Sequence, residues 1–284
     1  MNLVITTTQP KLYSITRFVE EATKLSISVS LLNPLTSVMP LHNLSNLWPR
    51  FDVILHRITG ARLDDFDLRV VESLISPGVQ VINNLPSLEA HRDKVRQFLY
   101  FKRHNLPLVP TIIFRGMPKR ENLDQTIDEL GSQLFVLKLE KGNQGHGVNL
   151  VHTREALYSL LETFHLVGVH NVMIQPFIED KKEFRVYFVK GEIIGVMERI
   201  CKDGGFKANF AQDSVARMVK KISPELEKLI ERIVQVSGLY YGSIDILESS
   251  AGPMILEVNS VTGFEQFEQV SGINFAQLVL SGIP

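Results

Sequence analysis

The sequence SIDILESSAGPMILEVNS, residues 243–260, contains two runs in which apolar and polar residues alternate. Alternation with a period of two predicts β-strands, here at residues 243–249 and 253–260. The segment Ser-Ala-Gly-Pro between them has the small residues and the proline that are typical of tight turns. The stretch is therefore predicted to form a β-hairpin.

Three polar side chains on this hairpin are candidates for a metal site: Asp245, Glu257 and Asn259. Successive side chains of a strand point to opposite faces, so Glu257 and Asn259 share a face, which Asp245 joins if the two strands pair. Two carboxylates and an amide oxygen form a hard, oxygen-only donor set that suits Mg²⁺. An ordinary solvated strand face is an alternative explanation of these three residues. Their neighbours are apolar, which predicts only that the opposite face of the strands is buried. These neighbours are Ile244, Ile246, Leu256 and Val258.

Isolated cations lie within or beside other apolar runs. Lys138 interrupts the apolar run at residues 134–139, where an unpaired ammonium group would be costly to bury. Lys94 lies at the start of a predicted helix, and Arg185 and Arg199 lie on consecutive predicted strands. Each alone fits a surface position or a weak surface ion pair. Cations that converge on an acidic strand face are what a metal–triphosphate requires, because they neutralise the charge that develops during phosphoryl transfer.

Two glycine-containing segments are candidates for loops over a ligand. In KGNQGHGVNL (141–150), Gly142, Gly145 and Gly147 follow a predicted buried strand, and glycine permits close approach of the backbone to a ligand. The spacing is not that of a P-loop, so this segment is either a nucleotide loop of another kind or a glycine-rich hairpin. The second segment is ERICKDGGFKANFAQD (198–213), between the strands of Arg199 and Asp245. Three of its polar side chains could reach a phosphate or a carboxylate there: Lys202, Lys207 and Asn209.

Composition narrows the class of protein. The 284 residues are 44% hydrophobic and 21% charged with a formal net charge of −1, which is ordinary for a soluble enzyme and argues against broad binding to nucleic acid. The single cysteine, Cys201, cannot form an internal disulfide, so we expect a reducing cytoplasm. We expect no signal peptide at the N-terminus and no membrane span, since no apolar run approaches the roughly 18 residues that a span needs.

The predicted elements alternate between strands and helices at first, and the last third is richer in strands. The first third alternates strands (2–6, 27–32, 51–56 and 79–84) with helices (12–24 and 64–75), which predicts a mostly parallel sheet. A helical pattern then follows Pro86 and continues to about residue 104. The middle has strands at 108–114, 134–139, 148–152 and 172–177, with helices at 121–130 and 154–164. The last third has strands at 183–191, 192–200, 243–249 and 253–260, with helices at 223–237 and 264–280.

Together these segments resemble the ATP-grasp superfamily, and most closely the RimK-type amino-acid ligases with their LysX relatives. Seven motifs occur in order between about Asp52 and Leu280, and their number and order make the resemblance specific. They are AHRDKVRQFL, VLKLEKGNQGHGV, MIQPFIED, KEFRVYFV, MERICKDGGFKAN, SIDIL and LEVNSVTGFEQFEQVSGI.

The resemblance implies an ATP-grasp fold, α/β and α+β, in three parts. A Rossmann-like N-terminal domain is expected at residues 1–90, a small central α+β subdomain at 91–175, and a C-terminal α+β subdomain with the metal site at 176–284. ATP is expected between the last two.

The resemblance also implies roles for the candidate residues. Lys94 and Lys138 resemble lysines that hold the α- and β-phosphates, and the loop 142–147 resembles a flap over the triphosphate. The remaining nucleotide contacts are expected from the backbone that meets the adenine edge (Gln175, Pro176, Phe177 and Ile178), from Glu183 at the ribose, and from Lys207 and Asn209 at the phosphates. Asp245, Glu257 and Asn259 resemble the Mg²⁺ ligands, with Glu257 bridging two ions. Arg185 and Arg199 resemble arginines near the transferred phosphate and the acyl intermediate.

The implied reaction is ATP-dependent ligation of a carboxylate to an amine through an acyl phosphate. The expected substrates are glutamate or another amino acid and the carboxylate of a peptide, protein C-terminus or cofactor. The expected cofactors are ATP and two Mg²⁺ ions, which Mn²⁺ could replace, and the expected assembly is a homodimer or homotetramer without nucleic acid or membrane.

Two positions differ from the family pattern. Pro176 stands where relatives usually have an acid, and residues 212–214 (Gln-Asp-Ser) replace a frequent Arg-Gly-Gly, which leaves nucleotide and substrate choice open. A small-molecule ligase of the glutathione-synthetase or dipeptide-ligase type is an alternative, and so is a nucleotide-binding module without turnover. A protein kinase is disfavoured, because no His-Arg-Asp catalytic-loop signature is present.

Overall fold

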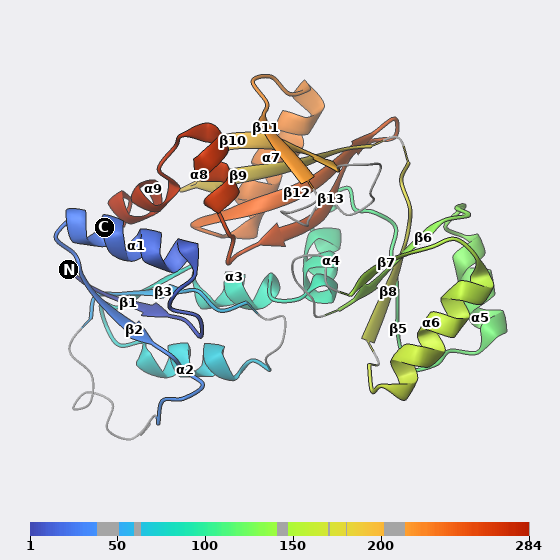
Figure 1. Cartoon of the computed structure of the whole chain (residues 1–284), viewed down its shortest axis with the longest axis horizontal. Helices are drawn as coiled ribbons and strands as arrows, with labels where there is room; N and C mark the ends of the chain where they lie inside the picture. Colours follow the sequence, from blue (N-terminus) through green and yellow to red (C-terminus); the bar gives the residue numbers. More distant parts are fainter. Residues whose placement is uncertain are drawn as a thin grey trace.

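Three β-sheets and the helices that cover them make up the computed structural model (Figure 1). The structure describes residues 1–38, 51–59, 64–140, 147–169, 171–179, 181–201 and 214–283. In these ranges no helix has the length and apolar character needed to cross a lipid bilayer.

The first sheet is parallel throughout, which confirms the expectation for the first third of the chain. Its strands have the order β2-β1-β3-β4. They are β1 (Asn2–Thr6), β2 (Ser28–Leu32), β3 (Val53–His56) and β4 (Gln80–Ile82), with helices α1 (Tyr13–Lys24) and α2 (Phe66–Leu74). Apolar side chains fill both faces, as is typical of a parallel sheet covered by helices.

Two helices form where one continuous helical pattern is predicted after Pro86. They are α3 (Leu85–Ala90) and α4 (Lys94–Arg103). The Asp93 carboxylate accepts a hydrogen bond from the backbone N–H of Arg96 at 2.7 Å, so Asp93 is an N-cap and Lys94 is the first residue of a new helix.

The second sheet is antiparallel, with the order β5-β8-β6-β7. Its strands are β5 (Ile112–Arg115), β6 (Phe135–Leu139), β7 (Val148–Val151) and β8 (Asn171–Pro176), and helices α5 (Arg120–Asp128) and α6 (Arg154–Leu166) pack on one face. The strand predicted from residue 108 begins only at Ile112, because Leu108 instead forms a bridge to Ile255 of another sheet.

The third sheet has the order β11-β10-β9-β12-β13 and contains the predicted hairpin. Its strands are β9 (Lys181–Val189), β10 (Glu192–Cys201), β11 (Ser214–Met218), β12 (Tyr241–Ser249) and β13 (Gly252–Asn259). Strands β9 and β10 are joined by a tight turn, and its two residues Lys190 and Gly191 both have positive φ (53° and 84°), as in a type I′ turn. Strand β11 was not predicted.

The C-terminal helices also differ from the prediction in one respect. Helix α7 (Pro224–Ser237) begins after its N-cap Ser223, as expected. The single helix predicted at 264–280 is two helices, α8 (Glu265–Ser271) and α9 (Phe275–Ser281), because Gly272 adopts a left-handed conformation with φ 71° and ends the first.

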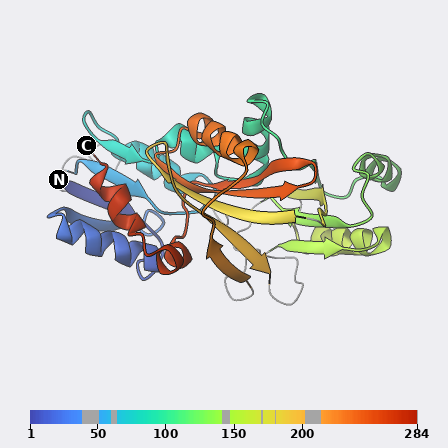
Figure 2. The same cartoon turned by 90° about the horizontal axis from the view of Figure 1, so that it is seen from above.

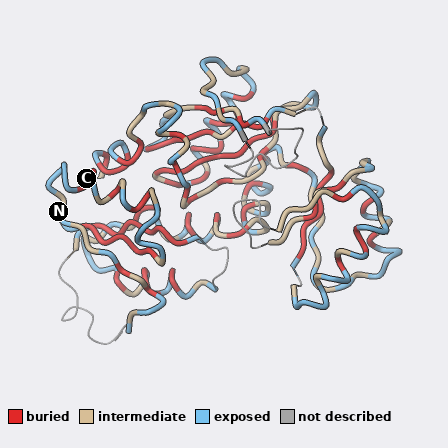
Figure 3. The backbone as a smooth tube through the Cα atoms, viewed as in Figure 1, coloured by how far each residue is buried: buried red, intermediate tan, exposed pale blue. Residues whose placement is uncertain are grey.

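The third sheet uses its two faces differently. One face packs against α4 and α7 in an apolar cluster. On the other face, the end near the first sheet is covered by α8, α9 and α1, with aromatic side chains in contact with one another: Tyr187, Tyr241, Phe264, Phe267 and Phe275. Buried residues follow the strands of all three sheets, as the red tube in Figure 3 shows. The remaining part of this face is polar, and Figure 2 shows that the second sheet lies beyond that end of the strands.

Asn83 joins the first and third sheets. Its side chain is fully buried and donates to the carbonyl oxygens of Tyr241 (3.0 Å) and Ser260 (2.9 Å). Its Oδ1 accepts from the N–H groups of Tyr240 (2.7 Å) and Tyr241 (3.1 Å). The start of β12 and the residue after β13 are therefore held by one amide.

Replacing Asn83 by leucine is expected to destabilise the protein by about 3 kcal/mol, because buried N–H and C=O groups are left without partners. Urea denaturation followed by circular dichroism measures the change. The exposed Asn122→Leu in α5 is the matched control and should change stability by no more than about 0.5 kcal/mol. Equal stability of the two variants would contradict the role of Asn83.

Candidate active site

The three predicted metal ligands and one predicted arginine lie together on the third sheet. Asp245 pairs directly with Glu257 across β12 and β13, and Asn259 pairs with Ser243. On its other side Asp245 pairs with Arg185 of β9. The expectation that hairpin pairing brings Asp245 to the face of Glu257 and Asn259 is confirmed.

A β-bulge changes the expected orientation of Leu256. The register shifts between the pairs Asp245–Glu257 and Ile246–Ile255, which leaves Leu256 as an extra residue. Ile255 and Val258 are buried in the core, whereas Leu256 and Glu257 are both half-buried. The prediction that Leu256 lies on the buried opposite face was wrong, because the bulge interrupts the alternation and Leu256 lines a pocket instead.

Asp245 is a fully buried carboxylate between two guanidinium groups. Nε and Nη2 of Arg185 donate to its two oxygens at 2.7 and 2.6 Å, and Nη2 of Arg199 lies 3.1 Å from Oδ1. Burial opposes ionisation of Asp245, but the charges of Arg185 and Arg199 outweigh it and lower its pKa to about 2. Asp245 is therefore ionised at neutral pH.

Glu183 and Arg199 are direct neighbours on β9 and β10 and form a second buried ion pair. Burial raises the pKa of Glu183, and the charge of Arg199 opposes that rise. Nε of Arg199 is buried and has no hydrogen-bond partner among the described residues. In this structure Glu183, expected at a ribose, contacts Arg199 through Oε1, so a ribose would meet its other oxygen or a rearranged pair.

The donor set of the hairpin has the oxygen chemistry of a divalent-cation site, although Asp245 would have to give up a bond to Arg185 or Arg199 to bind the cation. Nδ2 of Asn259 lies 3.5 Å from Oδ2 of Asp245 and 3.4 Å from Oε1 of Glu257, so the three side chains converge on one point. Rotation of the Asn259 amide would turn its oxygen toward that point. Among the described residues no group of three His, Cys, Asp or Glu side chains could hold a metal, so a cation here would depend on the amide oxygen and on ligands outside the protein.

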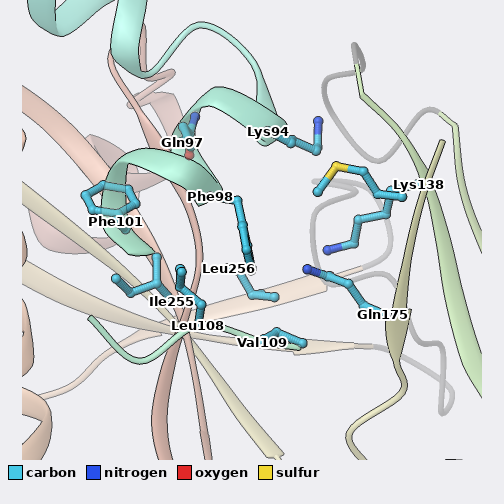
Figure 4. Close-up of a pocket in the computed structure, with 11 residues that line it drawn as sticks. Lys94, Gln97, Phe98, Phe101, Leu108, Val109, Lys138, Gln175, Ile255 and Leu256 are labelled. Carbon is cyan, nitrogen blue, oxygen red and sulfur yellow. The ribbon is translucent and has the colours of Figure 1, made fainter. Parts of the chain in front are cut away.

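A pocket lies between α4, strand β13 and the second sheet (Figure 4). Its volume is about 20 Å³, and side chains from α4, β6, β8 and β13 line it, including Lys94, Lys138, Gln175 and Leu256. Figure 4 shows the amino group of Lys138 and the amide of Gln175 pointing into it. A volume close to that of one water means that a larger ligand enters only when the walls move apart.

Lys138 has a lowered pKa in this pocket. Burial lowers the pKa to about 8, and the charge of Lys94 adds to that effect, while the carboxylates of Glu257 and Glu183 oppose it. The apolar run predicted to carry Lys138 is strand β6, and its alternate residues Phe135 and Leu137 are buried against the helices. Lys138 is on the opposite face of β6 from Phe135 and Leu137, and this face borders the pocket.

The segment Gln175–Ile178 follows the expected path along β8 to the boundary between the second and third sheets. Nε2 of Gln175 donates to Oγ1 of Thr111 at 2.8 Å. The N–H of Phe177 donates to the carbonyl of Leu134 at 2.8 Å and is not available to a ligand, and Pro176 has no N–H. The contact between this backbone and a base stays a prediction, in which the carbonyl of Phe177 and the N–H of Ile178 would take part.

The glycine loop joins neighbouring antiparallel strands, β6 and β7, so its flanks form the hairpin that the sequence allowed. Gly147 has φ 73°, and a Cβ there would lie 2.8 Å from the side chain of Leu139, so glycine is required. Four predicted site residues lie outside the described residues: Gly142, Gly145, Lys207 and Asn209.

Sequence reasoning missed two residues of this region, Gln97 and Leu256. A signal for Gln97 was available, because it lies three residues after Lys94 and so shares a side of the same helix. No signal for Leu256 was available, since its direction depends on the bulge.

Comparison with known proteins agrees with this geometry. Residues 91–283 match the family model of the RimK-like ATP-grasp domain. A probable alpha-L-glutamate ligase 1 from Shewanella denitrificans is 31% identical, over 100% of this chain and 97% of its own length. A probable alpha-L-glutamate ligase from Legionella pneumophila is 29% identical, over 100% and 95%.

Solved structures show the same fold. A RimK domain protein from Sphaerobacter thermophilus superposes with a TM-score of 0.77 at 18% identity, covering 99% of this chain and 98% of that one. The D-alanine–D-alanine ligase of Bacillus anthracis, complexed with ATP, gives 0.72 at 18% identity, covering 98% and 94%. The predicted ATP-grasp fold is thereby confirmed, and the chain belongs to the RimK-like ATP-grasp family of ATP-dependent ligases.

Proposed function

We propose that this ligase joins an amino acid, with glutamate the first candidate, to the carboxylate of a peptide, protein or cofactor through an acyl-phosphate intermediate. One observation carries the proposal: the buried Arg185–Asp245–Arg199 cluster lies beside an oxygen donor set, and two lysines line a pocket with Leu256, the neighbour of Glu257. The glutamate assignment is supported by the names of the relatives that match along their whole length.

In this proposal the nucleotide occupies the pocket between the second and third sheets. Lys94 and Lys138 hold its phosphates, and Leu256 and residues 175–178 contact its base, with the N–H of Ile178 as a donor. Glu183 contacts the ribose, and Lys207 and Asn209 contact phosphates. The corresponding division of the chain is into residues 1–90, 91–175 and 176–284.

Asp245, Glu257 and Asn259 would hold Mg²⁺, which when bound neutralises charge on the phosphates. An oxygen of the substrate carboxylate attacks the γ-phosphorus, the bond to the β-phosphate oxygen breaks, and ADP leaves. The amine then attacks the acyl carbon, loses a proton and displaces phosphate. Arg185 and Arg199 stabilise negative charge on the transferred group, and the protein contributes mainly orientation and electrostatics.

The proposal is tested by measuring ADP release with ATP, Mg²⁺ and single amino acids, each combined with a set of peptide and cofactor carboxylates. Mass spectrometry should find a product heavier by one glutamate residue. Products from another amino acid would correct the substrate only. Tight binding of ATP without turnover in any mixture would instead support a nucleotide-binding module.

The affinity for ATP is expected to fall as the pH rises above about 8. With its lowered pKa, Lys138 carries the charge that attracts phosphate below pH 8 and loses it above, so Kd should rise by about tenfold per pH unit at most. Calorimetric titration between pH 7 and 9.5 measures this. Lys138→Arg keeps its charge and should give a flat profile; the same decline in that variant would assign the effect to another group.

Glu257→Gln is expected to lower turnover by about 100-fold or more, because a carboxylate of the proposed cation site loses its charge. The matched control is Glu227→Gln on the exposed side of α7, which should retain the wild-type rate. An unchanged rate in Glu257→Gln would reject the metal assignment.

Arg199→Met is expected to lower kcat by about 10²- to 10³-fold while KM for ATP changes little, because Arg199 is proposed to act on charge that develops only during transfer. The substitution also leaves Glu183 without its buried partner. Adding Glu183→Gln should therefore recover thermal stability but not kcat. Equal losses in kcat and ATP affinity would contradict the proposed role.

A further inference from the structure

The strand that carries Glu257 and Asn259 lies at the edge of its sheet. In the described part of the chain β13 has one strand neighbour, β12. An edge strand presents backbone N–H and C=O groups that no neighbouring strand pairs, and it is free to shift unless something else binds them.

Gln97 binds these groups at Val258. Its Oε1 accepts the Val258 N–H at 2.9 Å, and its Nε2 donates to the Val258 carbonyl at 2.8 Å and to the His91 carbonyl at 2.9 Å. A primary amide carries an acceptor and donors side by side, so this side chain makes the pair of bonds that a further strand would make. Gln97 is only 9% exposed, so water does not readily replace it.

The position of this contact connects two parts of the candidate site. Val258 lies between Glu257 and Asn259, and Gln97 lies one helical turn after Lys94 on α4. Just before the bulge, the Ile255 N–H donates to the Pro107 carbonyl at 3.0 Å. The outer edge of β13 is thus bound on both sides of the bulge at Leu256. Helix α4 binds it after the bulge, at Val258, and the segment that follows α4 binds it before the bulge, at Ile255.

We propose that Gln97 is a positioning residue that holds the backbone between Glu257 and Asn259 in register with Lys94, and so sets the affinity for Mg²⁺ in the nucleotide complex. The inference rests on the proposed function, because it takes these three residues as ligands of the metal and the phosphates. Gln97 also lines the pocket, but the three hydrogen bonds of its amide all go to backbone groups. It acts through the Val258 backbone, as outer groups that orient metal ligands do.

The test uses Gln97→Met in the full chain, which keeps the length of the side chain and removes all three hydrogen bonds. The Mg²⁺ concentration for half-maximal ADP release should rise by about tenfold or more, while kcat at saturating Mg²⁺ falls by less than about threefold. The control is Tyr100→Phe, which removes the 2.5 Å hydrogen bond from the same helix to the Val236 carbonyl and leaves the bonds between Gln97 and Val258 in place. This control should keep the wild-type Mg²⁺ dependence.

Two readouts do not depend on turnover. Hydrogen–deuterium exchange of a peptide covering residues 253–260 should be faster in Gln97→Met and unchanged in Tyr100→Phe. Mn²⁺ binding in the presence of a non-hydrolysable ATP analogue, followed by the electron paramagnetic resonance of the free ion, should be about tenfold weaker in Gln97→Met. If Gln97→Met does not fold, Gln97→Glu is used in its place. Glutamate keeps the acceptor for the Val258 N–H and loses the two donated bonds, so the same changes in exchange and in Mn²⁺ binding are expected.

The outcomes separate the inference from the proposed function. Wild-type protein that releases no ADP in any mixture counts against the proposed function, and the exchange and Mn²⁺ measurements still decide the role of Gln97. Unchanged exchange at 253–260 in the Gln97 variant overturns the inference. Faster exchange with unchanged Mg²⁺ and Mn²⁺ dependence also overturns it, because Gln97 would then stabilise β13 without positioning the ligands.

Discussion

The buried carboxylate of Asp245 is the constraint on which the site depends. A fully buried negative charge is costly unless cations and hydrogen bonds compensate it, and here Arg185 binds both oxygens while Arg199 approaches one. These contacts come from β9 and β10 and fix the two guanidinium groups beside the hairpin. The ion pair of Arg199 with Glu183 extends the network, so the third sheet cannot shift its strands without separating charges in the interior.

The rest of the fold supports this sheet from two sides. The first sheet holds the hairpin through Asn83 and through Arg57, whose guanidinium donates to the Thr262 carbonyl at 2.8 Å and the Tyr241 hydroxyl at 3.0 Å. The aromatic cluster under α8 and α9 closes the same end of the sheet. Among the described residues the aromatic cluster does not extend over the polar face at the opposite end, and Lys138 of the second sheet lines the pocket there. The third sheet therefore carries the carboxylates of the candidate site, and the second sheet carries Lys138.

Much of this arrangement could be predicted from residue patterns, for local reasons. Period-two alternation located β12 and β13, and their pairing placed Asp245 opposite Glu257 as expected. The parallel first sheet followed from alternating strands and helices. Helix ends were less predictable, because a single residue can interrupt a continuous helical pattern. Asp93 caps the start of α4 with its side chain, and Gly272 ends α8 by adopting a left-handed conformation.

Residue order alone was enough to assign most of the candidate side chains to a strand face, since alternation and helical periodicity are local properties of the backbone. It also contains the seven ordered motifs from which the family could be recognised. The direction of Leu256 toward the pocket, the ion pair of Glu183 with Arg199 and the pairing of Gln97 with Val258 became visible only in the folded chain. These depend on a bulge, on strand register and on contacts between residues up to 161 positions apart, and no local pattern encodes such distances.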